Sequence, residues 1–207
     1  MLKPAVFLER DGVLNSLVFD EARGGMVSPL QPDQLSLGRQ AASFVSQLNR
    51  RGFLVLVVTS QPGIAQGRLD AMRLDRIHNR LRARLASSEA RLDGVFVCPH
   101  DAEAQAEPGL TIRPELTVDC QCRCPAPGLL LKAAAVHRVD LPRSFMICQD
   151  LQDVKAGRSA TVETILLTNS KLSQIEASPE LRPNHVAVDL ATALGIIDAS
   201  REASLQL

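Results

Sequence analysis

The run Phe53-Leu54-Val55-Leu56-Val57-Val58 decides the fold class of this 207-residue chain. An unbroken series of aliphatic and aromatic residues, without polar alternation, is typical of a strand buried on both faces. Similar short runs recur at Ala5–Leu8, Gly94–Val97, Ser144–Cys148 and Val162–Leu167. The sequence therefore predicts a parallel sheet that is covered on both sides.

Segments with helical periodicity lie between these runs. Apolar residues recur at helical spacing on one face of 39–50 and of 70–85, and further helices are predicted over 129–137 and 187–197. The alternation predicts an α/β fold with a parallel sheet flanked by helices. We expect one domain over residues 1–207 with a frayed tail from about residue 200.

Composition excludes several classes of function. The chain has 23 basic and 23 acidic residues, so its net charge is zero, and this argues against nucleic-acid binding. No run of about 18 apolar residues predicts a membrane span, and the N-terminus does not resemble a signal peptide. A cytoplasmic location is the expectation. The sequence leaves open whether the chain is a monomer or an oligomer.

The segment 98–125 has no periodicity and contains four of the five cysteines. Cys98-Pro99-His100 and Cys120-Gln121-Cys122 offer three thiolates and one imidazole, which are a ligand set for tetrahedral Zn²⁺. A bound ion would order a loop that has no hydrophobic core of its own. We predict a structural zinc site at these four residues, with Cys124 as a competing ligand. His78 and His137 are interpreted as surface or boundary residues, and His185 receives no role.

Four motifs carry a family resemblance. The run Val6-Phe7-Leu8-Glu9-Arg10-Asp11-Gly12-Val13 resembles the first motif of the haloacid dehalogenase (HAD) superfamily, a strand followed by Asp-x-Asp-Gly-Thr. Residues 58–67, 120–125 and 146–153 are similar, in order, to later motifs of the D-glycero-D-manno-heptose-1,7-bisphosphate phosphatases, relatives of the histidinol-phosphate phosphatases. The resemblance implies a HAD-type Rossmann-like fold with a zinc-binding loop and no large cap domain.

The resemblance also implies roles for individual residues. Such enzymes transfer a phosphoryl group through an aspartyl-phosphate, with Mg²⁺ and a Lys neutralising the phosphate. Glu9 occupies the nucleophile position, Asp11 the acid/base position and Cys124 the Lys position. The substrate-binding positions are Thr59, Ser60, Gln61 and Arg123, and the family's phosphate-loop Arg is Gln66. A degenerate Mg²⁺ site falls on Glu9, Asp11, Gln149 and Asp150, and Asp153 matches the last residue of the final motif.

Three departures from the family pattern coincide. Glu9 moves the attacking oxygen by one methylene, Cys124 removes a cation, and Gln149 removes a metal carboxylate. We therefore expect a pseudoenzyme that binds a phosphorylated sugar, another small phosphate ester or a partner enzyme. The alternative is an active Mg²⁺-dependent phosphatase on a sugar phosphate or histidinol phosphate. A third hypothesis assigns redox, metal or nucleophilic chemistry to Cys124 and Cys148, although inert space-filling thiols are favoured.

Overall fold

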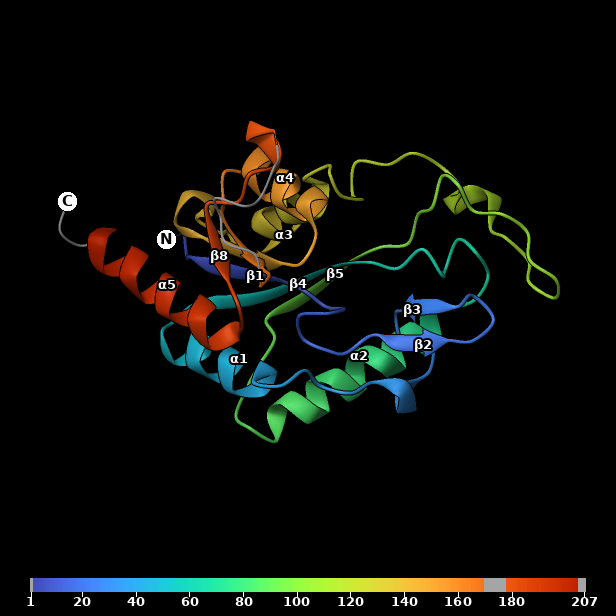
Figure 1. Cartoon of the computed structure of the whole chain (residues 1–207), viewed down its shortest axis with the longest axis horizontal. Coiled ribbons are helices and arrows are strands. Elements are labelled where there is room, and N and C mark those ends of the chain that lie inside the picture. The colour runs from blue at the N-terminus through green and yellow to red at the C-terminus, as the bar shows by residue number, and fades with distance from the viewer. Residues whose placement is uncertain (1, 170–177, 205–207) are drawn as a thin grey trace.

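A six-stranded parallel sheet forms the centre of the computed structural model, which describes residues 2–169 and 178–204 (Figure 1). The strands lie in the order β5-β4-β1-β6-β7-β8. Their bounds are β1 Ala5–Glu9, β4 Leu54–Ser60, β5 Gly94–Cys98, β6 Phe145–Cys148, β7 Glu163–Leu167 and β8 His185–Ala187. The predicted parallel α/β fold is thereby confirmed.

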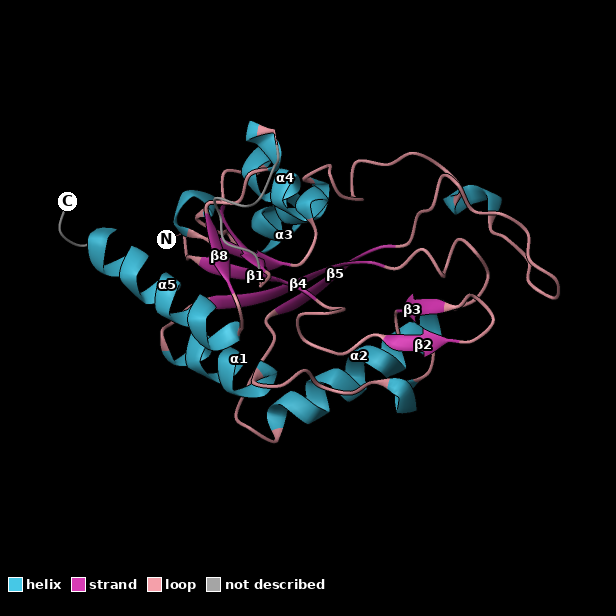
Figure 2. Ribbon diagram, viewed as in Figure 1, coloured by secondary structure: helices cyan, strands magenta, loops and turns pink. Residues whose placement is uncertain are grey.

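Helices cover both faces of this sheet (Figure 2). One face carries α1 (Ala41–Arg50), α2 (Ala71–Ala86) and α5 (Leu190–Ser204), and the other carries α3 (Gly128–His137) and α4 (Leu151–Ser159). Successive side chains of β4 point to opposite faces of the sheet. Val55 and Val57 pack on the face covered by α1, whereas Leu56 and Val58 pack on the face covered by α3. Burial on both sides explains why the run at 53–58 has no polar alternation.

The strand order reverses next to β1. From the central β1 the chain moves outward through β4 to β5, and then returns to β6 and continues outward through β7 to β8. Ligands of such sheets bind in the crevice at the carboxyl ends of the strands where the order reverses. Glu9 ends β1 and Cys148 ends β6, so this crevice lies among the candidate residues.

Two segments extend beyond the carboxyl ends of β4 and β5 (Figure 1). One is an antiparallel hairpin of β2 (Val18–Asp20) and β3 (Gly25–Val27), which the sequence did not predict. The other is the 98–125 loop, which is irregular apart from one short 3-10 turn at Pro114–Leu116. Both therefore lie where they can border a ligand crevice.

The C-terminal region differs from the prediction. Residues 185–187 form β8, so Ala187, predicted to begin a helix, ends a strand instead. His185 lies on this edge strand, where it pairs with Glu163. Helix α5 begins at Leu190 and continues to Ser204, so residues 200–204 are helical rather than frayed. The remainder of the predicted tail, 205–207, lies outside the described residues. Within the described part of the chain, every helix is too short or too polar to cross a bilayer.

Candidate active site

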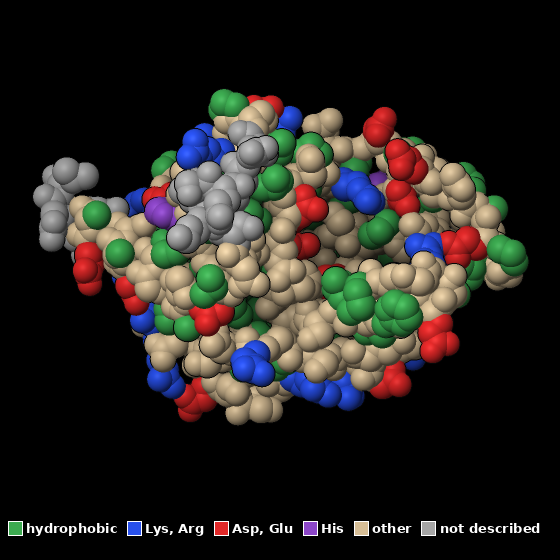
Figure 3. All heavy atoms as spheres, in the orientation of Figure 1, with side chains coloured by type: hydrophobic (Ala, Val, Ile, Leu, Met, Phe, Trp, Pro, Cys, Tyr) green, Lys and Arg blue, Asp and Glu red, His purple; other side chains and the backbone are tan. Residues whose placement is uncertain are grey.

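A pocket of about 90 Å³ opens at the carboxyl ends of β1 and β4, beside the reversal of strand order. Figure 3 shows acidic side chains gathered at a hollow between helix α4 and the β2–β3 hairpin. The polar lining residues are Glu9, Asp11, Thr59, Ser60, Cys124 and Asp153. The pocket thus brings together candidates that lie far apart in the sequence.

Glu9 stands at the end of β1, and its carboxyl group lies beside that of Asp153 in the pocket. The backbone amide of Gln149 donates to Oε2 of Glu9 at 3.4 Å, and the Asp153 carboxyl lies within hydrogen-bonding reach of Glu9. Burial raises the pKa of Glu9 to about 8, and the neighbouring charge of Asp153 adds to the rise. At neutral pH the two carboxyl groups therefore hold a proton between them.

Asp153 also reaches the thiol of Cys124. Burial raises the pKa of Asp153, while a hydrogen bond from Cys124 opposes that rise. Burial raises the pKa of the Cys124 thiol, and the negative charge of Asp153 raises it further. Cys124 is consequently a neutral thiol in the position where the family resemblance places a Lys.

Cys148 is the second thiol near this site, but it does not line the pocket. It is completely buried at the end of β6. Burial raises its pKa well above the ordinary value, and the charges of Asp153 and Glu9 add to that rise. Neither Cys124 nor Cys148 is a thiolate near neutral pH, which favours the space-filling interpretation of both.

Asp11 is saturated with hydrogen bonds. It accepts from Arg10 at 2.8 Å, Asn15 at 2.9 Å, Ser28 at 2.8 Å and Gln61 at 2.7 Å. The Arg10 side chain is fully buried and forms an ion pair with Asp11. The carboxylate is therefore held in place by neighbours from the segment after β1, the end of the β2–β3 hairpin and the loop after β4.

His78 was expected to be an ordinary surface or boundary residue, and that expectation was wrong. The side chain is buried beneath Arg10, whose Nη1 lies 3.1 Å from His78 Nε2. Burial lowers the pKa of His78 to about 4, and the positive charge of Arg10 lowers it further. A neutral imidazole is thus an acceptor for the buried guanidinium, although helical spacing alone gave no sign of this role.

Gln149 lies over the backbone of Gly12, outside the pocket lining. Its Nε2 donates to the Gly12 carbonyl at 3.0 Å. A Cβ added to Gly12 would lie 2.3 Å from Oε1 of Gln149, and Gly12 has a φ of +84°. Glycine is favoured at this position because the backbone is left-handed, and any other residue would also displace the exposed carboxamide of Gln149.

The four residues predicted for Mg²⁺ do not converge. Asp150 caps α4, where its Oδ1 accepts from the Gln152 amide at 2.7 Å, and the Gln149 side chain is bonded to Gly12. Among the described residues, no acidic group at this pocket brings three ligand atoms within 4.8 Å of one another. Mg²⁺ is held by carboxylate oxygens, and of the four predicted residues only Glu9 and Asp11 line the pocket.

The loop after β4 contributes polar groups that are already engaged. The buried Gln61 side chain donates to Thr59 Oγ1 at 2.9 Å as well as to Asp11. Ser60 lines the pocket at the end of β4. Of the predicted substrate-binding residues, Thr59 and Ser60 face the pocket, whereas Gln61 supports them and Arg123 lies on the 98–125 loop.

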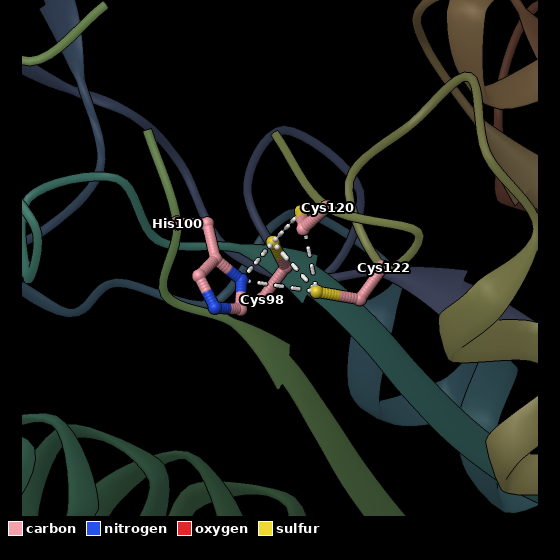
Figure 4. Close-up of side chains that lie close together, drawn as sticks. All are labelled: Cys98, His100, Cys120 and Cys122. Carbon is pink, nitrogen blue, oxygen red and sulfur yellow. Dashed lines mark hydrogen bonds between the residues drawn. The ribbon is translucent and has the colours of Figure 1, made fainter. Parts of the chain in front are cut away.

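The predicted zinc ligands meet in a separate cluster (Figure 4). The ligand atoms of Cys98, His100, Cys120 and Cys122 all lie within 4.8 Å of one another, and adjacent atoms are 3.2–3.6 Å apart. A tetrahedron with metal–sulfur bonds of about 2.3 Å has edges near ~3.7 Å. The donor set and spacing therefore fit Zn²⁺. Cys124 lies outside the cluster and lines the pocket instead.

Two residues of the site were given no role from the sequence. The role of Asp153 could have been inferred from the sequence, because Asp153 matches a position of the final motif. It lies in the first turn of α4, after the capping residue Asp150. No sequence pattern indicated a role for Ser28, because the β2–β3 hairpin that brings it to Asp11 was not predicted. Contacts made by short irregular segments have no periodic pattern from which to predict them.

Comparison with known proteins agrees with this architecture. A family model described as HAD-hydrolase-like matches residues 121–193. The D-glycero-beta-D-manno-heptose-1,7-bisphosphate 7-phosphatase of Pasteurella multocida is 32% identical over 169 residues, covering 82% of this chain and 83% of that protein. The phosphatase of the same name from Vibrio cholerae is 33% identical over 170 residues, covering 82% and 83%.

A solved structure has the same fold. The crystal structure of D,D-heptose 1,7-bisphosphate phosphatase from B. bronchiseptica, complexed with magnesium and phosphate, matches with a TM-score of 0.76. The match covers 95% of this chain and 99% of that chain at 24% identity. Similarity at that identity establishes the fold, and the sequence relatives establish the family.

Proposed function

Because the chain belongs to the HAD family of heptose-1,7-bisphosphate phosphatases, we propose that it is a phosphosugar-binding member without ordinary phosphatase turnover. It is a HAD-type phosphatase homologue, and the proposal concerns its altered pocket. One observation carries the proposal. Glu9 and Asp153 line one pocket whose described lining residues include no Lys or Arg.

A protonated Glu9 is poorly suited to attack phosphorus. In-line displacement needs an ionised carboxylate at the correct distance from the phosphorus atom. Glu9 extends one methylene further than Asp, and a displacement of about 1 Å costs on the order of 100-fold in rate. Both its length and its protonation therefore oppose formation of an acyl-phosphate.

The pocket also lacks the charges that stabilise a transferring phosphoryl group. A phosphate that entered it would meet Glu9 and Asp153, while Cys124 supplies no positive charge. Arg10 supplies no charge to a ligand, because it is buried against Asp11. Electrostatic stabilisation is usually the largest part of such catalysis, so its removal supports a loss of turnover.

Binding of an anion remains supported at the edge of the site. Arg123 immediately precedes Cys124, and its side chain is 42% exposed. Within the part of the chain that the structure describes, its Nη2 and Nε make no hydrogen bond. A guanidinium with unused donors recognises phosphate groups. We propose a phosphorylated sugar or another small phosphate ester as the ligand, with a scaffolding role for a partner enzyme as the remaining alternative.

We also propose that the cluster at Cys98, His100, Cys120 and Cys122 holds one structural Zn²⁺. The ion would join the end of β5 to the segment before α3 and so order the 98–125 loop. Metal analysis of protein purified without chelators should find about one zinc per chain. A metal-free protein with an ordered loop would contradict this assignment.

The test of lost turnover is an assay of the purified protein with heptose 1,7-bisphosphate and with p-nitrophenyl phosphate in the presence of Mg²⁺. The P. multocida relative, assayed beside it, serves as the positive control. We expect phosphate release at the background rate. A kcat of about 1 s⁻¹ or more, as is typical of enzymes, would overturn the proposal.

An active phosphatase with altered residues is the second candidate function. Its favouring observation is that Glu9 and Asp153 place two carboxyl groups side by side in one pocket. Beryllium fluoride, a mimic of the acyl-phosphate, separates the two candidates. A bound fluoride signal that disappears in Glu9→Gln would favour the phosphatase, whereas no binding near Glu9 would count against it.

A further inference from the structure

Arg123 is held against the zinc cluster by two contacts. Its Nη1 donates to the carbonyl oxygen of His100, a predicted zinc ligand, at 2.9 Å. The same Nη1 lies 3.8 Å from Oδ1 of Asp101. The orientation of this guanidinium therefore depends on the backbone at residues 100–101, immediately beside the cluster.

Asp101 connects this guanidinium to the loop after β4. Its Oδ2 accepts from Nε2 of Gln66 at 2.7 Å, and its backbone amide donates to the Leu116 carbonyl at 3.1 Å. Its side chain is mostly buried, with 14% exposed. Asp101 thus faces Arg123 with one oxygen and Gln66 with the other, and it cannot move without disturbing both.

The same contacts continue into the β2–β3 hairpin. Arg23 on the hairpin reaches Oε1 of Gln66 at 3.5 Å and pairs with Glu107 on the 98–125 loop. Gln66 thereby donates to Asp101 and accepts from Arg23. An Arg at position 66 could not accept from Arg23, so the neutral amide suits this bridge.

Backbone contacts fix the two loops against each other. The Arg113 amide donates to the Ala65 carbonyl at 2.8 Å. A Cβ added to Gly67 would lie 2.1 Å from the Thr111 carbonyl oxygen, and Gly67 has a φ of +73°. This close approach leaves Asp101 and Gln66 little freedom to separate while the 98–125 loop keeps its shape.

We propose that Asp101 is a positioning residue that transmits the order of the zinc cluster to Arg123, and through it to the bound anion. The inference rests on the proposed function, because Arg123 is the side chain proposed to meet the phosphate group. Asp101 fixes the guanidinium from the side, while the His100 carbonyl fixes it from the cluster. Binding of zinc and binding of a phosphate are therefore coupled through residues 100, 101 and 123.

The test measures the affinity for inorganic phosphate of zinc-loaded and zinc-stripped protein by calorimetry. We expect the wild-type chain to lose about 3- to 10-fold in affinity when zinc is removed. Asp101→Asn should lose a similar factor while zinc is bound, and should lose less than the wild type when zinc is removed, because only the His100 contact then still depends on the cluster. Glu115→Gln, which neutralises an exposed acid of the same loop, is the matched control and should behave as the wild type.

The sign of the effect separates positioning from charge. Removal of the Asp101 charge would by itself strengthen anion binding, because it removes a Coulomb repulsion between two negative groups. Weaker binding by Asp101→Asn, with recovery in Asp101→Glu, therefore supports positioning. Stronger binding, or a wild-type dependence on zinc in Asp101→Asn, would overturn the inference.

A second measurement needs no ligand. Phenylglyoxal modifies free guanidinium groups, and peptide mass spectrometry gives the rate at Arg123. The rate should rise severalfold in Asp101→Asn and in zinc-stripped protein, but not in Glu115→Gln. If wild-type protein does not bind phosphate, the anion-binding part of the proposed function fails, and this labelling decides the inference alone. An unchanged labelling rate at Arg123 would overturn it.

Discussion

The zinc cluster and the pocket at Glu9 lie at neighbouring strand ends, and they use their polar atoms in opposite ways. The atoms of Cys98, His100, Cys120 and Cys122 point toward one another around a common centre. Beside the pocket, and outside its lining, Asp150 caps a helix and Gln149 bonds to Gly12. The cluster therefore directs its polar atoms toward a centre that an ion can fill, whereas Asp150 and Gln149 bond to neighbouring backbone groups.

Restoring the family residues should have the largest effect on this comparison. The triple variant Glu9→Asp, Cys124→Lys, Gln149→Asp returns the nucleophile, the cation and the metal carboxylate. We expect its kcat/KM for heptose 1,7-bisphosphate to exceed the wild-type value by at least ~100-fold, because distance and charge are both corrected. Phosphate release in the presence of Mg²⁺ measures it.

The matched control for the triple variant keeps length but not charge. Cys124→Met replaces Cys124→Lys in the same background of Glu9→Asp and Gln149→Asp. Equal turnover by the two triple variants would show that the positive charge at position 124 does not determine the rate of phosphate release.

Disruption of the zinc cluster should have the next largest effect. Cys120→Ser removes one of four ligands, so we expect loss of zinc and a decrease in the free energy of unfolding of roughly 3 kcal/mol or more. The 98–125 loop should loosen while the sheet remains folded. Urea unfolding, metal analysis and hydrogen exchange of the loop measure these changes.

Cys124→Ser is the control for the zinc variant, since Cys124 lies at the pocket rather than in the cluster. It should retain about one zinc per chain. Zinc loss in Cys124→Ser would mean that Cys124 is a ligand in place of one of the four.

Gly12→Ala tests the contact between the carboxamide of Gln149 and Gly12. The new Cβ collides with Oε1 of Gln149, and the φ of +84° disfavours alanine. We expect a loss of roughly 2 kcal/mol in the free energy of unfolding. The double variant Gly12→Ala, Gln149→Ala should recover the part due to the collision but not the part due to the backbone. No difference between the single and double variants would contradict the contact.

The titration of Glu9 gives the smallest predicted effect. Its folded-state pKa of about 8 lies above its ordinary value of 4.5, so the folded protein binds the extra proton between these pH values. The stability should therefore fall as the pH rises from about 4.5 to about 8, and level off above. Glu9→Gln should remove this slope and be more stable than the wild type above pH 8. Thermal unfolding across this range measures it, and an identical slope in both proteins would contradict the shared proton.

The sequence predicted the elements whose residues are buried by a regular pattern. Continuous apolar runs predicted β1, β4, β5, β6 and β7, because burial on two faces leaves no room for polar residues. The zinc ligands were also predictable, since metal chemistry restricts both residue type and spacing. The short strand β8 and the β2–β3 hairpin were not, because three residues cannot show a period.

The sequence predicted which residues lie at or near the pocket, but not the contacts that their side chains make. The motifs located Glu9, Cys124 and Gln149, yet nothing in them indicates that Gln149 turns onto Gly12. The pairing of Glu9 with Asp153 depends on burial, which arises from the packing of α3 and α4 around the pocket. Packing of this kind is set by distant parts of the chain, so local sequence does not encode it.

The buried ion pair of Arg10 with Asp11 has a consequence for how the family's history is interpreted. Removing one partner of a buried pair costs roughly 3–5 kcal/mol, since the other charge is left without compensation. A substitution of Asp11 would leave the completely buried Arg10 in that condition. Selection for a folded chain is then sufficient to retain Asp11, whether or not the chain is an active phosphatase. The presence of this aspartate is therefore not by itself evidence of hydrolysis.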